Sequence, residues 1–185
     1  MKIEATRLLR ALKAVEPAIS KDVAQSAIYR LLIEVSDKAC TIVSTDGHTL
    51  HKATIAGENG APWTVEITPT CVALLLRALR GAKGEAELSP ESCKIGATAV
   101  ALEIADDGAH FPPYAQIIPS DNPLLWAENG GPRGFDPEYL GRACKAIALY
   151  GADMRCFFGA ALDPCKLRVE DAGDTFEAII MPRRI

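Results

Sequence analysis

The stretch LLRALK at residues 8–13 recurs in altered form as LLRALR at 75–80 and as LGRACK at 140–145. The copies start at residues 8, 75 and 140, so their offsets are 67 and 65 residues. Each copy keeps leucine, arginine, alanine and a second basic residue at the same spacing. Self-similarity at a nearly fixed offset predicts that one supersecondary unit occurs three times in the chain.

The flanks of the three copies support this division. Thr68-Pro69 and Asp136-Pro137 are helix-start signals, and Thr6 occupies a similar place before the first copy. Short β-like runs follow each helix, namely 27–35, 40–45 and 49–55, then 85–89, 92–96 and 99–104, then 154–159, 165–170 and 175–182. A short strand is expected before each helix, at 2–5, 64–68 and 133–136. The sequence therefore predicts an α+β fold of three βαβββ units.

Two such units, residues 1–119, would form one compact domain. Residues 120–133 are rich in proline, glycine and asparagine, which is typical of a linker. Residues 134–185 would be a half domain of one unit. This unit has no internal mate, so we expect its strand edges and the inward side chains Leu140 and Ile147 to be exposed on a monomer.

Composition excludes several classes of protein. The net charge is −4, which argues against a simple basic nucleic-acid binder, and 49% of the residues are hydrophobic, enough for a sizeable core. None of the six cysteines forms a CxxC pair or fits a zinc template, so we expect reduced thiols, no metal and a cytoplasmic location. The N-terminus lacks the apolar region of a signal peptide, and no apolar run is long enough to cross a membrane.

The predicted helices are amphipathic. Leu8, Leu12 and Val15 share one face of the first helix. The corresponding inward sets are Cys71, Leu75 and Leu79 in the second helix and Leu140, Ala143, Cys144 and Ile147 in the third. Segments 6–17 and 68–84 carry net charges of +2 and +3, so the rest of the chain carries −9.

Basic residues on the opposite helix faces therefore suit a surface that faces phosphates. The candidate DNA-binding residues are Arg7, Arg10, Lys13, Arg77, Arg80, Lys83, Arg142 and Lys145. Because no aromatic residues interleave with them and no base-reading element is evident, we expect contacts to the backbone of duplex DNA, independent of base sequence. The alternative is an ordinary solvated helix face.

Three marks give the chain a family resemblance. They are Thr45-Asp46-Gly47-His48 with Leu50, then Phe111-Pro112-Pro113-Tyr114 leading to Ile117-Ile118-Pro119, and the C-terminal run 179–185. Together they resemble the bacterial DNA sliding clamp, the beta subunit of DNA polymerase III. Residues 1–119 are similar to the middle domain of that family, and residues 134–185 to the second half of its last domain.

The resemblance implies a sliding-clamp fold, with antiparallel sheets outside and helices on the DNA-facing side. It also implies a processivity or tethering factor that is not an enzyme, needs no cofactor and surrounds or associates with duplex DNA. Its partners would be a DNA polymerase, a clamp loader or repair proteins, bound through a short peptide motif. The alternative is a peptide-binding adaptor or competitor that forms no ring.

In the family a pocket between the middle and last domains binds this peptide. The positions that match it here are Ile28, Thr45, Gly47, His48, Thr49, Leu50, Pro112, Gln116, Ile117, Asp136, Tyr139, Met181, Pro182 and Arg183. Thr49 and Gln116 stand where arginine is typical, and Arg183 stands where an apolar residue is typical. The resemblance thus implies a pocket that differs from the family's pocket more in charge than in shape, and therefore a different partner specificity.

The chain contains three units where a family protomer has six, so four copies would restore the twelve helices of the family ring. A homotetramer is the expected assembly; an open dimer, or a monomer with the third unit docked on its own first domain, are the alternatives.

Other interpretations of single motifs also stay open. Asp46-Gly47 is a common hairpin turn by itself. The rings of His48 and His51 would point to opposite faces of a strand, which disfavours a metal site. No GxSxG elbow or glycine-rich phosphate loop is present, which disfavours an enzyme.

Overall fold

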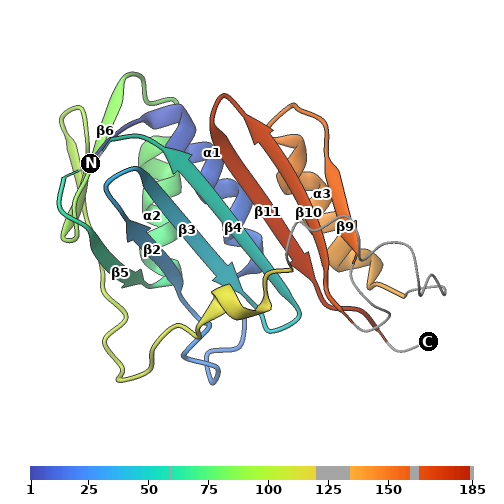
Figure 1. Ribbon diagram of the computed structural model, residues 1–185. Coiled ribbons are helices and arrows are strands. Elements are labelled where there is room, and N and C mark those ends of the chain that lie inside the picture. The colour runs from blue at the N-terminus through green and yellow to red at the C-terminus, as the bar shows by residue number, and fades with distance from the viewer. Residues whose placement is uncertain (59, 120–133, 159–162, 184–185) are drawn as a thin grey trace.

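The three repeats form three similar units in the computed structural model, which describes residues 1–58, 60–119, 134–158 and 163–183 (Figure 1). The first unit consists of β1 (Lys2–Glu4), α1 (Ala5–Val15), the 3-10 turn η1 (Glu16–Ala18), β2 (Leu31–Val35), β3 (Ala39–Thr45) and β4 (Thr49–Ala56). The second consists of β5 (Trp63–Ile67), α2 (Pro69–Leu79), β6 (Glu85–Leu88), β7 (Ser92–Ile95) and β8 (Thr98–Ala101), followed by the 3-10 turn η2 (Tyr114–Ile117). The third consists of α3 (Pro137–Ala148), β9 (Arg155–Phe158), β10 (Cys165–Asp171) and β11 (Asp174–Ile180).

The predicted unit order is confirmed, with two differences. The strand expected before the third helix is reduced to a single bridge between Gly134 and Arg183. The predicted strand at 27–35 begins only at Leu31, because residues 21–30 form turns. The linker predicted at 120–133 lies outside the described residues.

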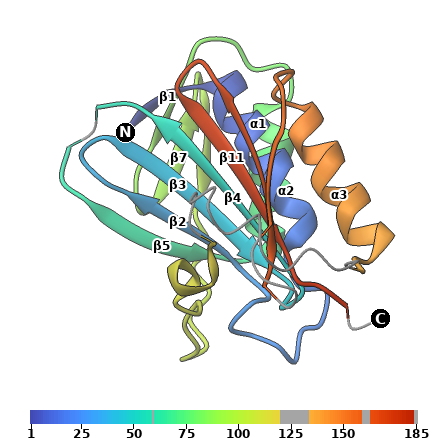
Figure 2. The same cartoon turned by 45° about the vertical axis from the view of Figure 1, so that its right-hand side comes forward.

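All strand pairings in the two sheets are antiparallel. Within the described residues, the larger sheet has seven strands in the order β5-β2-β3-β4-β11-β10-β9, and the smaller has four in the order β1-β6-β7-β8. The first two units exchange strands, since β5 of the second unit pairs with β2 of the first, and β1 pairs with β6. Helices α1, α2 and α3 lie on one side of the larger sheet (Figures 1 and 2).

The third unit docks directly on the first. β11 pairs with β4 from Thr175↔Thr54 to Ile180↔Thr49, so one sheet crosses the boundary between units. On the side of that sheet where the helices lie, α3 contacts α1, and Ile147 is buried in the common core. The expectation that this unit lacks an internal mate was therefore wrong for the β11 edge and for Ile147.

Local sequence explains where the helices begin. Thr68 accepts a hydrogen bond from the Cys71 amide at 3.2 Å, and Asp136 accepts one from the Glu138 amide at 2.8 Å; a proline follows each cap. The first helix differs, because it starts after Glu4 without a side-chain cap and the Thr6 hydroxyl bonds to Glu4 instead. The N-cap role expected of Thr6 was wrong.

Helix faces follow the predicted pattern in α1 and α2 but not throughout α3. Leu8, Leu12, Val15, Cys71, Leu75 and Leu79 are all buried. In α3, Ala143 and Ile147 are buried as predicted. Leu140 is 40% exposed, as expected for a single chain, whereas Cys144 is exposed and its inward assignment was wrong. The buried residues of α3 are Ala143, Ala146 and Ile147, so its inward face is narrower than the sequence pattern suggested.

His51 of β4 lies within this core. Its Nδ1 is 2.7 Å from the Ala14 carbonyl oxygen, and its ring meets Phe176 edge-on with centroids 5.2 Å apart. Among the described residues, no hydrogen-bond partner reaches its Nε2. Burial lowers the pKa of His51 to about 4, while the backbone contact to Ala14 opposes this shift.

Acid is therefore expected to destabilise the fold through His51. The unfolded chain protonates this histidine near pH ~6.5, whereas the folded chain resists protonation down to about pH 4. Its contribution is thus fully present above the unfolded pKa and is lost as pH falls towards the folded pKa. The free energy of unfolding should drop by about 2 kcal/mol between pH 7 and pH 5.

Urea denaturation across this pH range measures the effect. His51→Gln can still donate to Ala14 and should flatten the pH dependence, while the matched His48→Gln variant should keep it. Equal pH profiles for His51→Gln and the wild type would show that His51 is not the titrating group.

Candidate functional site: a cavity between the first and third units

A cavity of about 260 Å³ lies where the first unit, the segment after β8 and the end of β11 meet. Its lining residues are Ile28, Thr45, Gly47, His48, Thr49, Leu50, Pro112, Pro113, Tyr114, Gln116, Ile117, Ile179 and Met181. They come from four separate stretches of sequence. The wall is mostly apolar, with a few polar groups that can orient a ligand, as is typical of a binding pocket.

One wall is the β3–β4 hairpin turn. Gly47 has a φ of +83°, a conformation that favours glycine. The Asp46 carboxylate accepts hydrogen bonds from the amides of His48 at 3.0 Å and Thr49 at 2.7 Å. The Thr45 hydroxyl donates to the Thr49 carbonyl at 2.7 Å and accepts from the Gly47 amide at 3.1 Å. Hydrogen bonds of the Thr45 and Asp46 side chains thus fix the backbone of this turn and make the wall rigid.

The opposite wall is the segment from Phe111 to Ile117. Phe111, Tyr114 and Ile118 pack on a small apolar cluster of Leu32, Val43, Leu50 and Ile179. The Tyr114 hydroxyl donates to Glu34, and burial together with that carboxylate raises the pKa of Tyr114 well above its usual range. The wall is anchored at both its backbone and its aromatic side chains.

A buried arginine and its partners hold the backbone that leads into this second wall. Arg30 is 1% exposed and pairs with Glu66 at 2.7 Å and with Asp107 at 2.6 Å. It also donates to the carbonyl of Ala109 at 2.8 Å, and Glu66 in turn accepts from the Phe111 amide at 3.0 Å. This network sets the path of the chain into the cavity wall.

The C-terminal segment closes the cavity at the third unit. The Met181 amide donates to the His48 carbonyl at 3.0 Å, which joins the end of β11 to the hairpin turn. Arg183 forms an ion pair with Asp136, and its amide donates to Gly134 at 2.8 Å. Arg183 and Asp136 thus tie the chain end to the start of α3.

Ten of the fourteen positions proposed for a pocket line this cavity: Ile28, Thr45, Gly47, His48, Thr49, Leu50, Pro112, Gln116, Ile117 and Met181. Asp136, Tyr139, Pro182 and Arg183 are not among its lining residues. Tyr139 lies beside it and stacks on His48, with centroids 5.6 Å apart and planes 13° apart. Sequence reasoning did not name Pro113, Tyr114 and Ile179 as pocket residues, although all three belong to motifs that it had singled out.

The eight basic candidates fall into two groups. Arg7 and Arg10 pair with Asp174, the first residue of β11, and Arg142 pairs with Asp46 at 2.9 Å. Burial alone would raise the pKa of Asp174, but hydrogen bonds from Arg7 and Arg10 outweigh it and lower the pKa. These three arginines hold the third unit to the first.

The second group is exposed: Lys13, Arg77, Arg80, Lys83 and Lys145. Within the described part of the chain, no salt bridge is found for any of them. Arg80 and Lys83 were predicted on the second helix, but α2 ends at Leu79 and both lie in the turn that follows it. Exposed cations without an acidic partner are the ones that can meet phosphates.

Other kinds of site find no support in the described residues. No cluster of three or more histidine, cysteine or acidic residues there could hold a metal ion. None of the helices described is both long and apolar enough to span a bilayer.

Comparison with solved structures places this geometry among known folds. The chain aligns over its full length with the DNA polymerase III beta subunit of Thermotoga maritima, with a TM-score of 0.79 and 15% identity. The chain has the sliding-clamp fold. The clamps of Caulobacter crescentus and Pseudomonas aeruginosa match it equally completely, with TM-scores of 0.77 and 0.80 and identities of 21% and 15%.

The chain spans about two thirds of those clamps, 65% of the T. maritima and C. crescentus chains and 66% of the P. aeruginosa chain. No protein-family model and no curated protein matches the sequence. The likeness is therefore one of fold, at sequence identities too low to carry residue roles across.

Proposed function

We propose that this protein is a sliding-clamp-like tether, which associates with duplex DNA regardless of base sequence and holds a partner protein by a short peptide. It performs no catalysis itself and acts in the cytoplasm. Its partners are a DNA polymerase, a clamp loader or a repair protein. The observation that carries the proposal is the cavity, where segments near residues 28, 45–50, 112–117 and 179–181 converge within a sliding-clamp fold.

The cavity chemistry favours a peptide with one polar anchor and spaced apolar side chains. Leu50, Ile117 and Met181 offer apolar contacts, while His48 and Gln116 supply hydrogen-bonding groups at the rim. A peptide with a glutamine followed by spaced apolar residues meets both needs. The structure of the C. crescentus clamp is described as having PEG bound to a region suggested to tether beta-motifs, which agrees with a ligand site in this fold.

The DNA-facing surface rests on the helix side of the molecule. Of the eight basic residues proposed from the sequence, the exposed group Lys13, Arg77, Arg80, Lys83 and Lys145 is the part available for phosphates. Arg7, Arg10 and Arg142 contribute to the local potential, but their charges are already paired. Binding through such a surface depends on salt and not on base sequence.

We propose that four copies of the chain form a ring. Residues 1–119 would serve as a complete clamp domain and residues 134–185 as half of another, joined by 120–133. Among the described residues, the outer strands are β5 and β9 in the larger sheet and β1 and β8 in the smaller one, so each of the three units contributes at least one sheet edge. Pairing of two third units completes a domain, and two such dimers that meet through their N-terminal units close the circle with two-fold symmetry.

Light scattering behind size exclusion tests the ring. Four chains of 19.8 kDa give about 79 kDa, and that mass is expected at low micromolar concentration. A mass of one chain at every concentration would contradict the ring. It would instead favour the second candidate, an adaptor that keeps the peptide cavity but encircles no DNA.

A further inference from the structure

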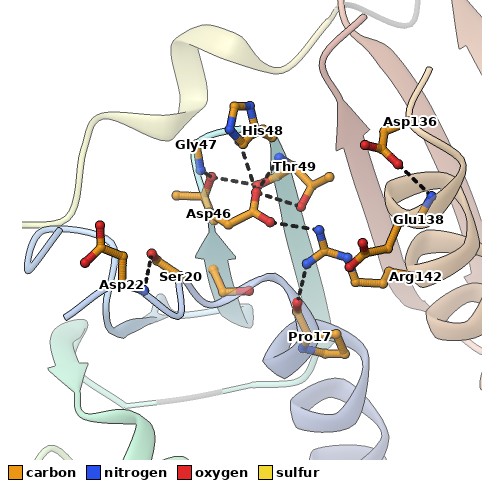
Figure 3. Close-up of polar contacts among 12 residues, drawn as sticks. Pro17, Ser20, Asp22, Asp46, Gly47, His48, Thr49, Asp136, Glu138 and Arg142 are labelled. Atoms are coloured by element: carbon orange, nitrogen blue, oxygen red, sulfur yellow. Dashed lines mark hydrogen bonds and ion pairs between the residues drawn. The ribbon is translucent and has the colours of Figure 1, made fainter. Parts of the chain in front are cut away.

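Arg142 connects three parts of the chain that are far apart in sequence (Figure 3). From α3, its Nη1 donates to the Pro17 carbonyl at 2.9 Å, just after α1. Its Nη2 donates to Asp46 at 2.9 Å, in the turn between β3 and β4. Its guanidinium lies over the Tyr139 ring at 4.7 Å from the centroid. A planar group with several donors suits such a multiple contact better than a lysine would.

Asp46 is the organising residue of the turn that Arg142 reaches. One carboxylate oxygen, Oδ1, accepts from the amides of His48 and Thr49 and from the Thr49 hydroxyl. The other oxygen, Oδ2, accepts from Arg142. Burial would raise the pKa of Asp46, but the hydrogen bonds from the turn and from Arg142 lower it. The carboxylate therefore stays charged and links the turn to α3.

The same turn forms a wall of the cavity. Gly47, His48 and Thr49 line it, and the His48 ring stacks on Tyr139, the residue over which Arg142 lies. Two contacts thus join α3 to this wall, one through Arg142 and Asp46 and one through Tyr139 and His48. Lys145, one turn further along α3, is exposed and takes no part in them.

We propose that Arg142 is a positioning residue for the cavity, which fixes the Asp46–Thr49 turn for peptide binding, and that it is not a DNA contact. This rests on the proposed function of the cavity. The physical reason is preorganisation: a wall that is ordered before binding costs less conformational entropy when the peptide arrives. The role differs from that expected of Arg142 from its spacing on the helix.

The test compares Arg142→Met with Lys145→Met, a matched removal of one cation from the same helix. Hydrogen exchange of the amides at 46–49 is measured, with the amides of β10 as an internal reference. In Arg142→Met the turn should exchange about tenfold faster, while β10 stays unchanged. A fluorescent peptide with a glutamine and spaced apolar residues should bind about tenfold more weakly, and duplex DNA almost normally. Lys145→Met should leave the exchange at 46–49 and the peptide affinity unchanged and should weaken duplex binding.

Two further variants keep the test sharp if Arg142→Met is poorly folded. Asp46→Asn retains an acceptor for the turn but loses the ion pair, so it should weaken peptide binding as much as Arg142→Met. The double variant should be no weaker than either single one, because the two residues act as one unit. Arg142→Lys should fall between the wild type and Arg142→Met.

Unchanged exchange at 46–49 in Arg142→Met would overturn the inference, as would additive losses in the double variant. A loss of duplex binding equal to that of Lys145→Met would also overturn it, by returning Arg142 to the DNA surface. Failure of the wild type to bind any peptide is a different result, since it removes the proposed function while the exchange rates still decide whether Arg142 fixes the turn.

Discussion

Replacing Ile117 and Met181 together by glutamate is expected to weaken peptide binding at least a hundredfold, or by about 3 kcal/mol. Both residues line the cavity and are partly exposed, at 42% and 39%, so the substitutions should leave the fold intact. Each would place a carboxylate against the apolar side chains of the ligand, and burying an unpaired charge is costly. Fluorescence anisotropy with a labelled peptide measures the loss.

Met154→Glu is the matched control for this variant. Met154 is also 42% exposed, but it lies outside the cavity, so the variant should bind peptide like the wild type. Circular dichroism and thermal unfolding should be similar for both proteins. Equal affinities for the cavity variant and the control would mean that the peptide does not bind in this cavity.

Reversing the charge of Lys13, Arg77 and Arg80 together should abolish duplex binding at physiological salt. These residues are exposed on or next to α1 and α2. Each phosphate contact contributes about 0.9 to the slope of log K against log salt. If all three residues meet phosphates, the slope should fall by about 3. The effect on unfolding should be small, because surface substitutions of this kind usually cost little stability.

The control must separate position from net charge. Lys21, Lys38 and Lys94 are exposed elsewhere, and reversing them makes the same change in net charge, from −4 to −10. This control should keep most of the duplex affinity and the wild-type salt slope. If both triple variants lose binding equally, the helices have no special role and only the overall charge matters.

The fold could be predicted from the sequence because its signals were local and occurred in each repeat. Two signals were direct. Thr68 and Asp136 cap helices by accepting hydrogen bonds from backbone amides, and the leucine spacing of α1 and α2 marks the buried helix face. The third helix was harder to predict. Its buried residues are Ala143, Ala146 and Ile147, and a face with two small alanines gives a weak periodic signal, so Cys144 was wrongly placed inside.

The roles of the basic residues could not be predicted from helix spacing. Arg10 and Arg77 occupy equivalent positions of the repeat, yet Arg10 is paired with Asp171 and Asp174 while Arg77 is exposed. The difference arises from the third unit, whose β10–β11 turn brings two carboxylates to α1. Such a contact depends on the docking of distant units, which single-helix periodicity does not contain.

The cavity shows the same division between local and distant signals. The Asp46-Gly47 turn is apparent in the sequence by itself. Its neighbours Ile28 and Met181 were placed there only through the family resemblance, and the structure brings them together on the same cavity. Asp136 and Arg183 were expected there too, but they satisfy each other in an ion pair at the start of α3.

The central claim is that one protein holds a peptide and duplex DNA at the same time, and retention of a labelled peptide on immobilised duplex tests it most directly. With wild-type protein present, the peptide signal should stay on the DNA at low salt and be released as salt rises. Without protein, or with the Ile117→Glu, Met181→Glu variant, little signal should remain. Peptide that binds the protein in solution but never appears on the DNA would contradict the tethering function.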